Sequence, residues 1–101
     1  MSYTGLVGSV DWTHRADYMA SRHGVDAEQA NEALADPDAL VFDPDYASQS
    51  GRSVRTIGWS PLAGRLLTVI TVAGDGVVYG VNGWPANDVD TRRYEGDDHD
   101  Q

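Results

Sequence analysis

The chain has 101 residues, a length that suits one domain, and 41% of them are hydrophobic, which allows a packed core and excludes wholesale disorder. Cys is absent, so disulfide frameworks and thiolate metal sites are excluded. Sixteen acidic residues against seven Arg and no Lys give a net charge of −9, the opposite of the basic footprint that most nucleic-acid-binding proteins carry. Any contact with RNA would have to come from a few clustered Arg side chains.

Nothing in the sequence favours export or a membrane. Residues 1–6 contain no basic and no long apolar segment, and the longest apolar-rich stretch, residues 66–73, is too short to cross a bilayer. We therefore expect no signal peptide, no membrane contact and a cytoplasmic location. The acidic body favours association with a basic partner protein.

Two helices are predicted first. One covers residues 13–23, with Thr13 as its N-cap, because apolar side chains recur there on one helical face and Gly24 suits the C-terminal cap. The other runs from the N-cap Asp26 to Asp36-Pro37, with Gln29 placed as in a capping box.

Strands follow the helices. A short edge strand at Val10-Asp11-Trp12 precedes them, and the main strands are predicted at 39–42, at 53–59, at 65–73 and after Gly76. Asp75-Gly76 is typical of a type I′ hairpin turn. With that turn, Val72 faces Tyr79 and Ile70 faces Val81 on one side of the sheet.

A short terminal helix starts after Pro85, with Asn87 as its N-cap and Gly96 at its end. The predicted fold class is α+β, with two N-terminal helices, a four-stranded mainly antiparallel sheet and a short C-terminal helix. Residues 1–96 are predicted to form a single domain, and residues 97–101 an acidic disordered tail.

His23 is the titratable side chain of most interest. It ends the first predicted helix, where the helix dipole favours a protonated imidazole. It is either a general acid or base, or a half-buried residue that closes the helix face. His14 and His99 share no metal-ligand spacing with it, so we expect no metal site and no cofactor.

Arg55 and Arg65 lie inside predicted strands, where both alternate with apolar residues. Their side chains are therefore expected on the more apolar side of the sheet, which is unusual for a charge. In one interpretation they line a cleft and hold a phosphate; in the other, each pairs with a helix acid or sits at a strand end.

Three further residues are candidates for RNA binding. Trp84 lies beside a turn, where it either packs in the core or an interface, or stacks on a base. Arg22 precedes His23, and Arg92 lies in the last turn of the terminal helix, where the helix dipole is the simpler explanation of its charge.

Several short motifs follow one another in a characteristic order. They are Val10-Asp11-Trp12, Arg22-His23-Gly24-Val25, Ala30 and Leu34 with Asp36-Pro37, Arg55-x-Ile57-Gly58-x-Ser60, Gly64-Arg65-Leu66-Leu67-x-Val69 and Arg92-Arg93-Tyr94-Glu95. By their order and spacing, roughly residues 10–95 resemble the BrnT-type toxins of bacterial toxin–antitoxin systems.

This resemblance implies a RelE-like ribonuclease fold, RNA cleavage without a metal, and neutralisation by a BrnA-like or other DNA-binding antitoxin, through which the protein could oligomerise. His23, Arg55 and Arg65 match family positions and are, by the resemblance, the candidate catalytic residues. The ribose 2′-OH would attack its own phosphate. His23 would transfer the proton, and the two Arg would stabilise the phosphorane.

One segment departs from the family pattern. Where the family has Ala-Arg-Arg-Ala-Thr before its terminal helix, this chain has Gly83-Trp84-Pro85-Ala86-Asn87, so two Arg are absent. The sequence therefore supports two functions. One is a metal-independent endoribonuclease toxin, and the other is a toxin-fold binding module without catalysis that acts through a protein partner.

Overall fold

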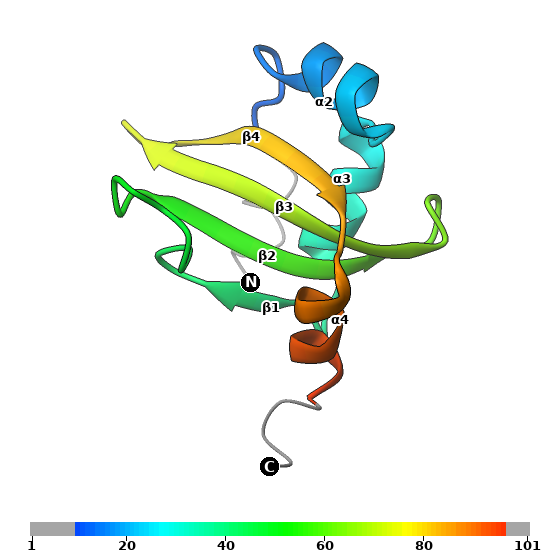
Figure 1. Ribbon diagram of the computed structural model, residues 1–101. Helices are drawn as coiled ribbons and strands as arrows, with labels where there is room; N and C mark the ends of the chain where they lie inside the picture. Colours follow the sequence, from blue (N-terminus) through cyan, green and yellow to red (C-terminus); the bar gives the residue numbers. More distant parts are fainter. Residues whose placement is uncertain (1–9, 97–101) are drawn as a thin grey trace.

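The computed structural model describes residues 10–96, and the tail predicted for 97–101 lies outside the described residues (Figure 1). A single four-stranded antiparallel sheet, with strand order β1-β2-β3-β4, is combined with helices before and after it. The α+β prediction is confirmed. In chain order the elements are α2 (Ala16–His23), α3 (Ala27–Ala35), β1 (Leu40–Phe42), β2 (Ser53–Ser60), β3 (Arg65–Gly74), β4 (Val77–Pro85) and α4 (Asp88–Glu95).

Helices α2 and α3 cover one face of the sheet. Helix α3 packs on β2 and β3, and α2 packs on β4 (Figure 1). Met19 and Ala33 from the helices meet Leu67 and Val69 from β3 in a core from which solvent is excluded. These apolar contacts supply the main driving force that holds the two layers together.

Two glycines allow the helix layer to approach the sheet closely. A Cβ at Gly58 would lie 2.1 Å from the carbonyl oxygen of Ala33, and a Cβ at Gly80 would lie 2.3 Å from the ring of Trp12. Neither position can hold a side chain without movement of its neighbour. The absence of a side chain at these strand positions therefore sets the distance between the layers.

The opposite face of the sheet carries α4 at one end. Alternation along β2 and β3 turns Ile57 and Ile70 away from the α2–α3 layer, and both are nevertheless buried. Asp90 of α4 reaches this face and contacts Arg55 and Thr68. We refer to it below as the α4 face.

The β3–β4 hairpin has the predicted turn, because Asp75 and Gly76 both have positive φ, 53° and 78°. Val72 faces Tyr79 as expected. The second predicted pair is wrong: Ile70 pairs with Asn82, because the register shifts between Ile70 and Thr71 and leaves an extra residue in β4.

Of the predicted N-terminal caps of the first two helices, one is confirmed and one is wrong. Asp26 and Gln29 form the predicted capping box. Thr13 is not an N-cap: the carboxylate of Asp11 accepts the Thr13 N–H, and α2 begins only at Ala16. The edge strand predicted around Asp11 is reduced to one parallel bridge. Within residues 10–96, no helix is long and apolar enough to span a membrane.

Candidate functional site

Trp84 brings two of the predicted catalytic residues together on the α4 face. Its ring centroid lies 5.8 Å from that of His23 and 5.6 Å from Cζ of Arg55. His23 comes from the end of α2, Trp84 from β4 and Arg55 from β2. Trp84, near the end of β4, thus supplies the aromatic ring between two candidate residues.

Aromatic rings and cations continue the contact in both directions. Towards α2, the Tyr18 ring lies 6.4 Å from the His23 ring, and Cζ of Arg15 lies 4.5 Å from the centroid of Tyr18. Towards α4, Cζ of Arg55 and Cζ of Arg93 lie 4.5 Å and 4.7 Å from the Tyr46 ring. We call this set the aromatic–arginine row: Arg15, Tyr18, His23, Trp84, Arg55, Tyr46 and Arg93.

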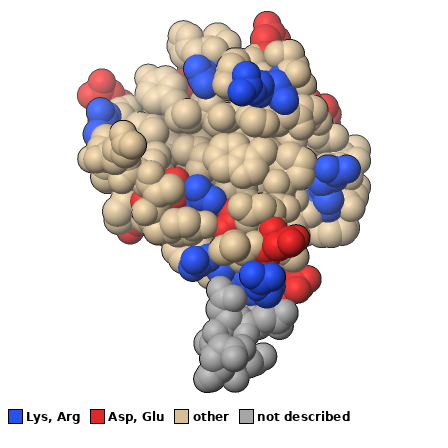
Figure 2. Space-filling view, in the orientation of Figure 1, with Lys and Arg blue, Asp and Glu red and all other residues tan. Residues whose placement is uncertain are grey.

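The row crosses an accessible surface. Tyr18 and Tyr46 expose 42% and 50% of their area, while Trp84 and His23 are half-buried. Figure 2 shows this face, with blue side chains over α2, over the sheet and over α4, and with red acidic side chains beside those over the sheet and α4. A row of this kind offers flat ring surfaces and positive charges to one extended ligand.

Local geometry explains how the row forms. Arg15 and Tyr18 are three residues apart, so they share a helical face near the start of α2. Phe42 pairs with Arg55 across β1 and β2, and its ring packs edge-on against Tyr46 at 5.2 Å. Antiparallel register therefore places the loop after β1 beside the β2 arginine.

Arg55 is buried and paired with two carboxylates. Its Nε donates to Oδ1 of Asp45 at 2.8 Å, and its Nη1 donates to Oδ2 of Asp90 at 2.7 Å. Burial would lower the pKa of Arg55, but the two carboxylates outweigh burial and raise that pKa. Of the two interpretations that the sequence allowed, the structure shows pairing with a helix acid. The cluster carries one excess negative charge, which does not favour a phosphate there.

Asp90 lies at the centre of this buried network. No part of its side chain is exposed, and it accepts hydrogen bonds from Thr68 and from the hydroxyl of Tyr46 as well as from Arg55. Burial opposes ionisation of Asp90, yet these hydrogen bonds outweigh it and hold the pKa of the carboxyl below its usual value. Asn87 caps the backbone N–H of Asp90, so the network also fixes the start of α4.

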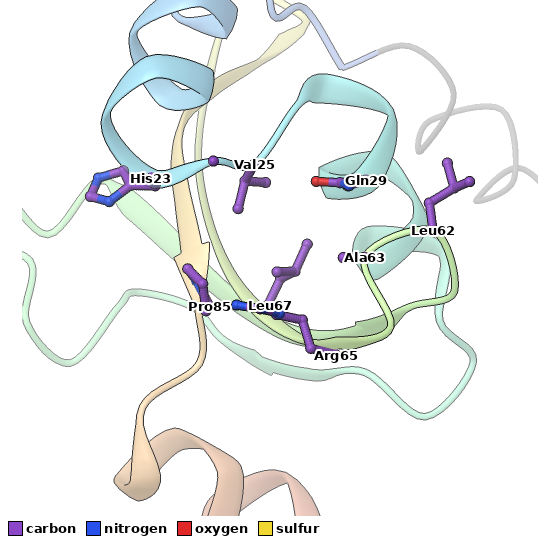
Figure 3. A pocket seen from close by; sticks show the side chains of 9 residues that line it. His23, Val25, Gln29, Leu62, Ala63, Arg65, Leu67 and Pro85 are labelled. Atoms are coloured by element: carbon purple, nitrogen blue, oxygen red, sulfur yellow. The ribbon is translucent and has the colours of Figure 1, made fainter.

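Arg65 lies apart from Arg55. Alternation along β3 places Arg65 on the side of Leu67, whereas Arg55 pairs with Ile70 on the α4 face. Arg65 and His23 both line a cavity of about 340 Å³ between the α2–α3 connection and the end of the sheet (Figure 3). In Figure 3 the ring of His23 lies across β4 from the other labelled side chains and points away from them.

The three predicted catalytic residues therefore do not converge on one point. His23 and Arg55 meet through Trp84, while Arg65 is exposed at the mouth of the cavity. Arg22 and Arg92 are exposed in the last turns of α2 and α4, and neither takes part in a described contact of the row.

No known family model matches the sequence, and a search of curated proteins found no significant match. Within residues 10–96, no three potential ligand side chains are close enough to hold a metal ion. A function must therefore be inferred from the positions and contacts of the side chains themselves.

Sequence reasoning missed part of the row. Tyr46 lies in an irregular loop where no periodicity could single it out, and Tyr18 carried no motif. Arg93 lies in the last turn of α4, where the helix dipole alone would explain its charge, although its guanidinium also lies over the Tyr46 ring. The one sequence signal for the row was the spacing of Arg15 and Tyr18. They are three residues apart, so they lie on the same helical face.

Proposed function

We propose that this chain is a cytoplasmic, BrnT-like toxin-type protein that binds single-stranded RNA along the aromatic–arginine row, with His23 as the candidate group for proton transfer in RNA cleavage. The observation that carries the proposal is the continuous series of contacts between rings and guanidinium groups from Arg15 to Arg93, with Tyr18 and Tyr46 exposed along it. Single-stranded nucleic acids bind in this way, because each base stacks on a ring while cations follow the backbone.

The charges define what kind of RNA binding is expected. The only salt bridges within residues 10–96 are those of Arg55, so Arg15 and Arg93 are the cations of the row without a carboxylate partner in that part of the chain. If each of these two arginines contacts one phosphate, the logarithm of the association constant should fall with the logarithm of the salt concentration with a slope of about −1.4. Stacking, rather than charge, would provide most of the affinity.

Cleavage is the less strongly supported half of the proposal. His23 is half-buried beside an exposed ring system, where it can reach a ribose, but Arg55 is neutralised by its two carboxylates. Arg55 would therefore position Trp84 and Tyr46 rather than bind the phosphorane. On this proposal a weak, metal-independent cleavage depends on His23.

The test is binding of a fluorescent single-stranded RNA of about 12 nucleotides, measured by anisotropy. Tyr18→Ala and Trp84→Leu should each weaken binding roughly 5- to 140-fold, the range for loss of one stacked base. Trp59→Ala is the matched control, because Trp59 is a 45% exposed tryptophan outside the row. His23→Gln should abolish cleavage while weakening binding no more than Tyr18→Ala does. Equal binding by the Tyr18, Trp84 and Trp59 variants would rule the row out.

A second function is favoured by the charge of the cluster around Arg55. Asp45 and Asp90 leave that centre with excess negative charge, and the whole chain carries −9. In this alternative the protein is a toxin-fold module without catalysis that acts through a basic, DNA-binding antitoxin-type partner. Folded protein that binds RNA but never cleaves it, and that co-purifies with the product of a neighbouring gene, would support this alternative.

A further inference from the structure

A second surface, separate from the row, exposes large apolar side chains. Trp59 at the end of β2 and Leu62 in the following turn expose 45% and 57% of their areas. They adjoin Pro61 and, from the end of α3, Ala35 and Pro37. We call these five residues the Trp59 surface. Trp59 is four residues from Arg55, about 13 Å along the strand, so this surface lies beyond the row.

Trp59 stands between two hollows. One, of about 270 Å³, is bounded by the end of α3, with Ala35 and Pro37, and by Pro61. The other, of about 440 Å³, lies between the end of β4 and α4, with Leu66 and Pro85 in its wall. A ridge with a hollow on each side can receive apolar side chains from a partner, which a flat surface cannot do.

The surface is held in place by carboxylates of α3. Oδ2 of Asp36 accepts the backbone N–H of Trp59 at 2.8 Å. Oε1 of Glu32 accepts the backbone N–H of Leu62 and the hydroxyl of Ser60, both at 2.8 Å. Because both strand end and turn are fixed before any partner arrives, little ordering would be required on binding.

The same carboxylates give the surface a negative charge. Glu32 and Asp36 border the first hollow, and Glu95 borders the second together with the exposed Arg65. Three carboxylates against one guanidinium leave the surface negative, most of all at the first hollow. No cation in residues 10–96 forms a salt bridge with any of them. Burial opposes ionisation of Asp36, yet hydrogen bonds from the Tyr94 hydroxyl and from two backbone N–H groups outweigh it and lower the pKa of this carboxyl.

We propose that the Trp59 surface is a docking site for a segment of a partner protein that carries an apolar anchor flanked by Arg or Lys. The anchor fills a hollow beside Trp59, and the basic side chains meet Glu32, Asp36 and Glu95. Charge complementarity selects this occupant. A second copy of this chain would bring two negative rims together, and a nucleic acid would bring phosphates to the same carboxylates. The proposal does not depend on RNA binding by the row.

The test uses three short synthetic peptides without Trp, titrated into the full chain by calorimetry. The first contains Leu and Arg, the second has Glu in place of every Arg, and the third has Ser in place of every Leu. The first should bind, and the other two should bind at least about tenfold more weakly, because each lacks one of the two required features. Equal binding of the first two, or no binding of the first, would overturn the proposal.

Variants locate the binding. Trp59→Ala should weaken the Leu/Arg peptide about 30-fold, as expected for a central tryptophan of an interface. Glu95→Gln removes an exposed charge that borders the second hollow and should weaken binding of this peptide by up to about 5-fold, with a smaller salt dependence. Tyr18→Ala is the matched control, because Tyr18 is equally exposed but lies on α2.

Two further outcomes would refute the proposed occupant. If sedimentation shows that the wild-type chain dimerises and that Trp59→Ala is monomeric, the surface joins two copies of this chain. If Trp59→Ala abolishes binding of single-stranded RNA, the surface serves RNA. The Tyr18 and Trp59 variants thus separate failure of this proposal from failure of RNA binding by the row.

Discussion

Replacement of Asp90 by Ala should destabilise the protein severely. The substitution removes the acceptor of hydrogen bonds from Arg55, Thr68 and Tyr46 and leaves a buried guanidinium with Asp45 as its one remaining carboxylate. Loss of one partner from a buried ion pair costs about 3–5 kcal/mol. Since the free energy of unfolding of a domain of this size is roughly 5–15 kcal/mol, a large share of it would be lost.

Urea unfolding followed by tryptophan fluorescence measures this effect. Asp90→Ala should move the midpoint to much lower urea with an unchanged m-value, and lower Tm by roughly 12 °C or more. Asp88→Ala is the matched control, because Asp88 lies in the same turn of α4 but is exposed. It should cost less than about 1 kcal/mol, as expected for a charge at a helix N-terminus.

Two results would refute this reasoning. Equal midpoints for Asp90→Ala and Asp88→Ala would mean that the buried network does not hold α4 on the sheet. The second test is the triple variant Arg55→Met, Asp90→Leu and Asp45→Asn, which removes all three charges of the network and should recover part of the loss. A triple variant less stable than Asp90→Ala would show that the unpaired buried charge was not the source of the effect.

Two further predictions concern the packing of α3 and α4. Gly58→Ala should cost about 3 kcal/mol or more in urea unfolding, because its Cβ would meet the Ala33 carbonyl oxygen; Gly83→Ala should cost about 1 kcal/mol, because its nearest neighbour is a flexible methionine sulfur at 3.0 Å. Similar losses for the two variants would contradict this steric argument. The hydrogen bond from Tyr94 to Asp36, with burial, raises the pKa of Tyr94 to about 12. The contribution of this hydrogen bond to the free energy of unfolding should therefore be complete below pH 10 and disappear as the pH rises towards 12. Urea unfolding of wild type and Tyr94→Phe should show a difference in stability that narrows over that interval. A constant difference would refute the assignment of the raised pKa to this hydrogen bond.

The order of the elements could be predicted because its signals are local. Asp26 and Asn87 each act on backbone groups within one helical turn, and both capping predictions are confirmed. The wrong predictions concern positions where a competing hydrogen-bond partner or a distant part of the chain determines the local structure. Thr13 had an alternative partner in Asp11, and the extra residue in β4 at Val81 depends on how a whole strand fits its neighbour.

The site was less predictable than the fold. His23, Trp84 and Arg55 could each be recognised as unusual residues, but their contact joins positions more than sixty residues apart in the chain, and it depends on sheet register. Pairing of Arg55 was one of two open alternatives, since the chain offers sixteen acids as partners. Nothing in the polar loop indicated that Tyr46 would cover that arginine.

The missing methyl group at Gly58 has an effect beyond the core. It allows the last turn of α3 to descend onto β2 at Ala33, and the neighbouring Glu32 and Asp36 then reach the backbone of the strand end and turn. The distance between α3 and β2 therefore determines the shape of the surface around Trp59 and Leu62. A change in packing at this one strand position should therefore alter the hydrogen bonds that hold Trp59 and Leu62 in place at the far end of the sheet.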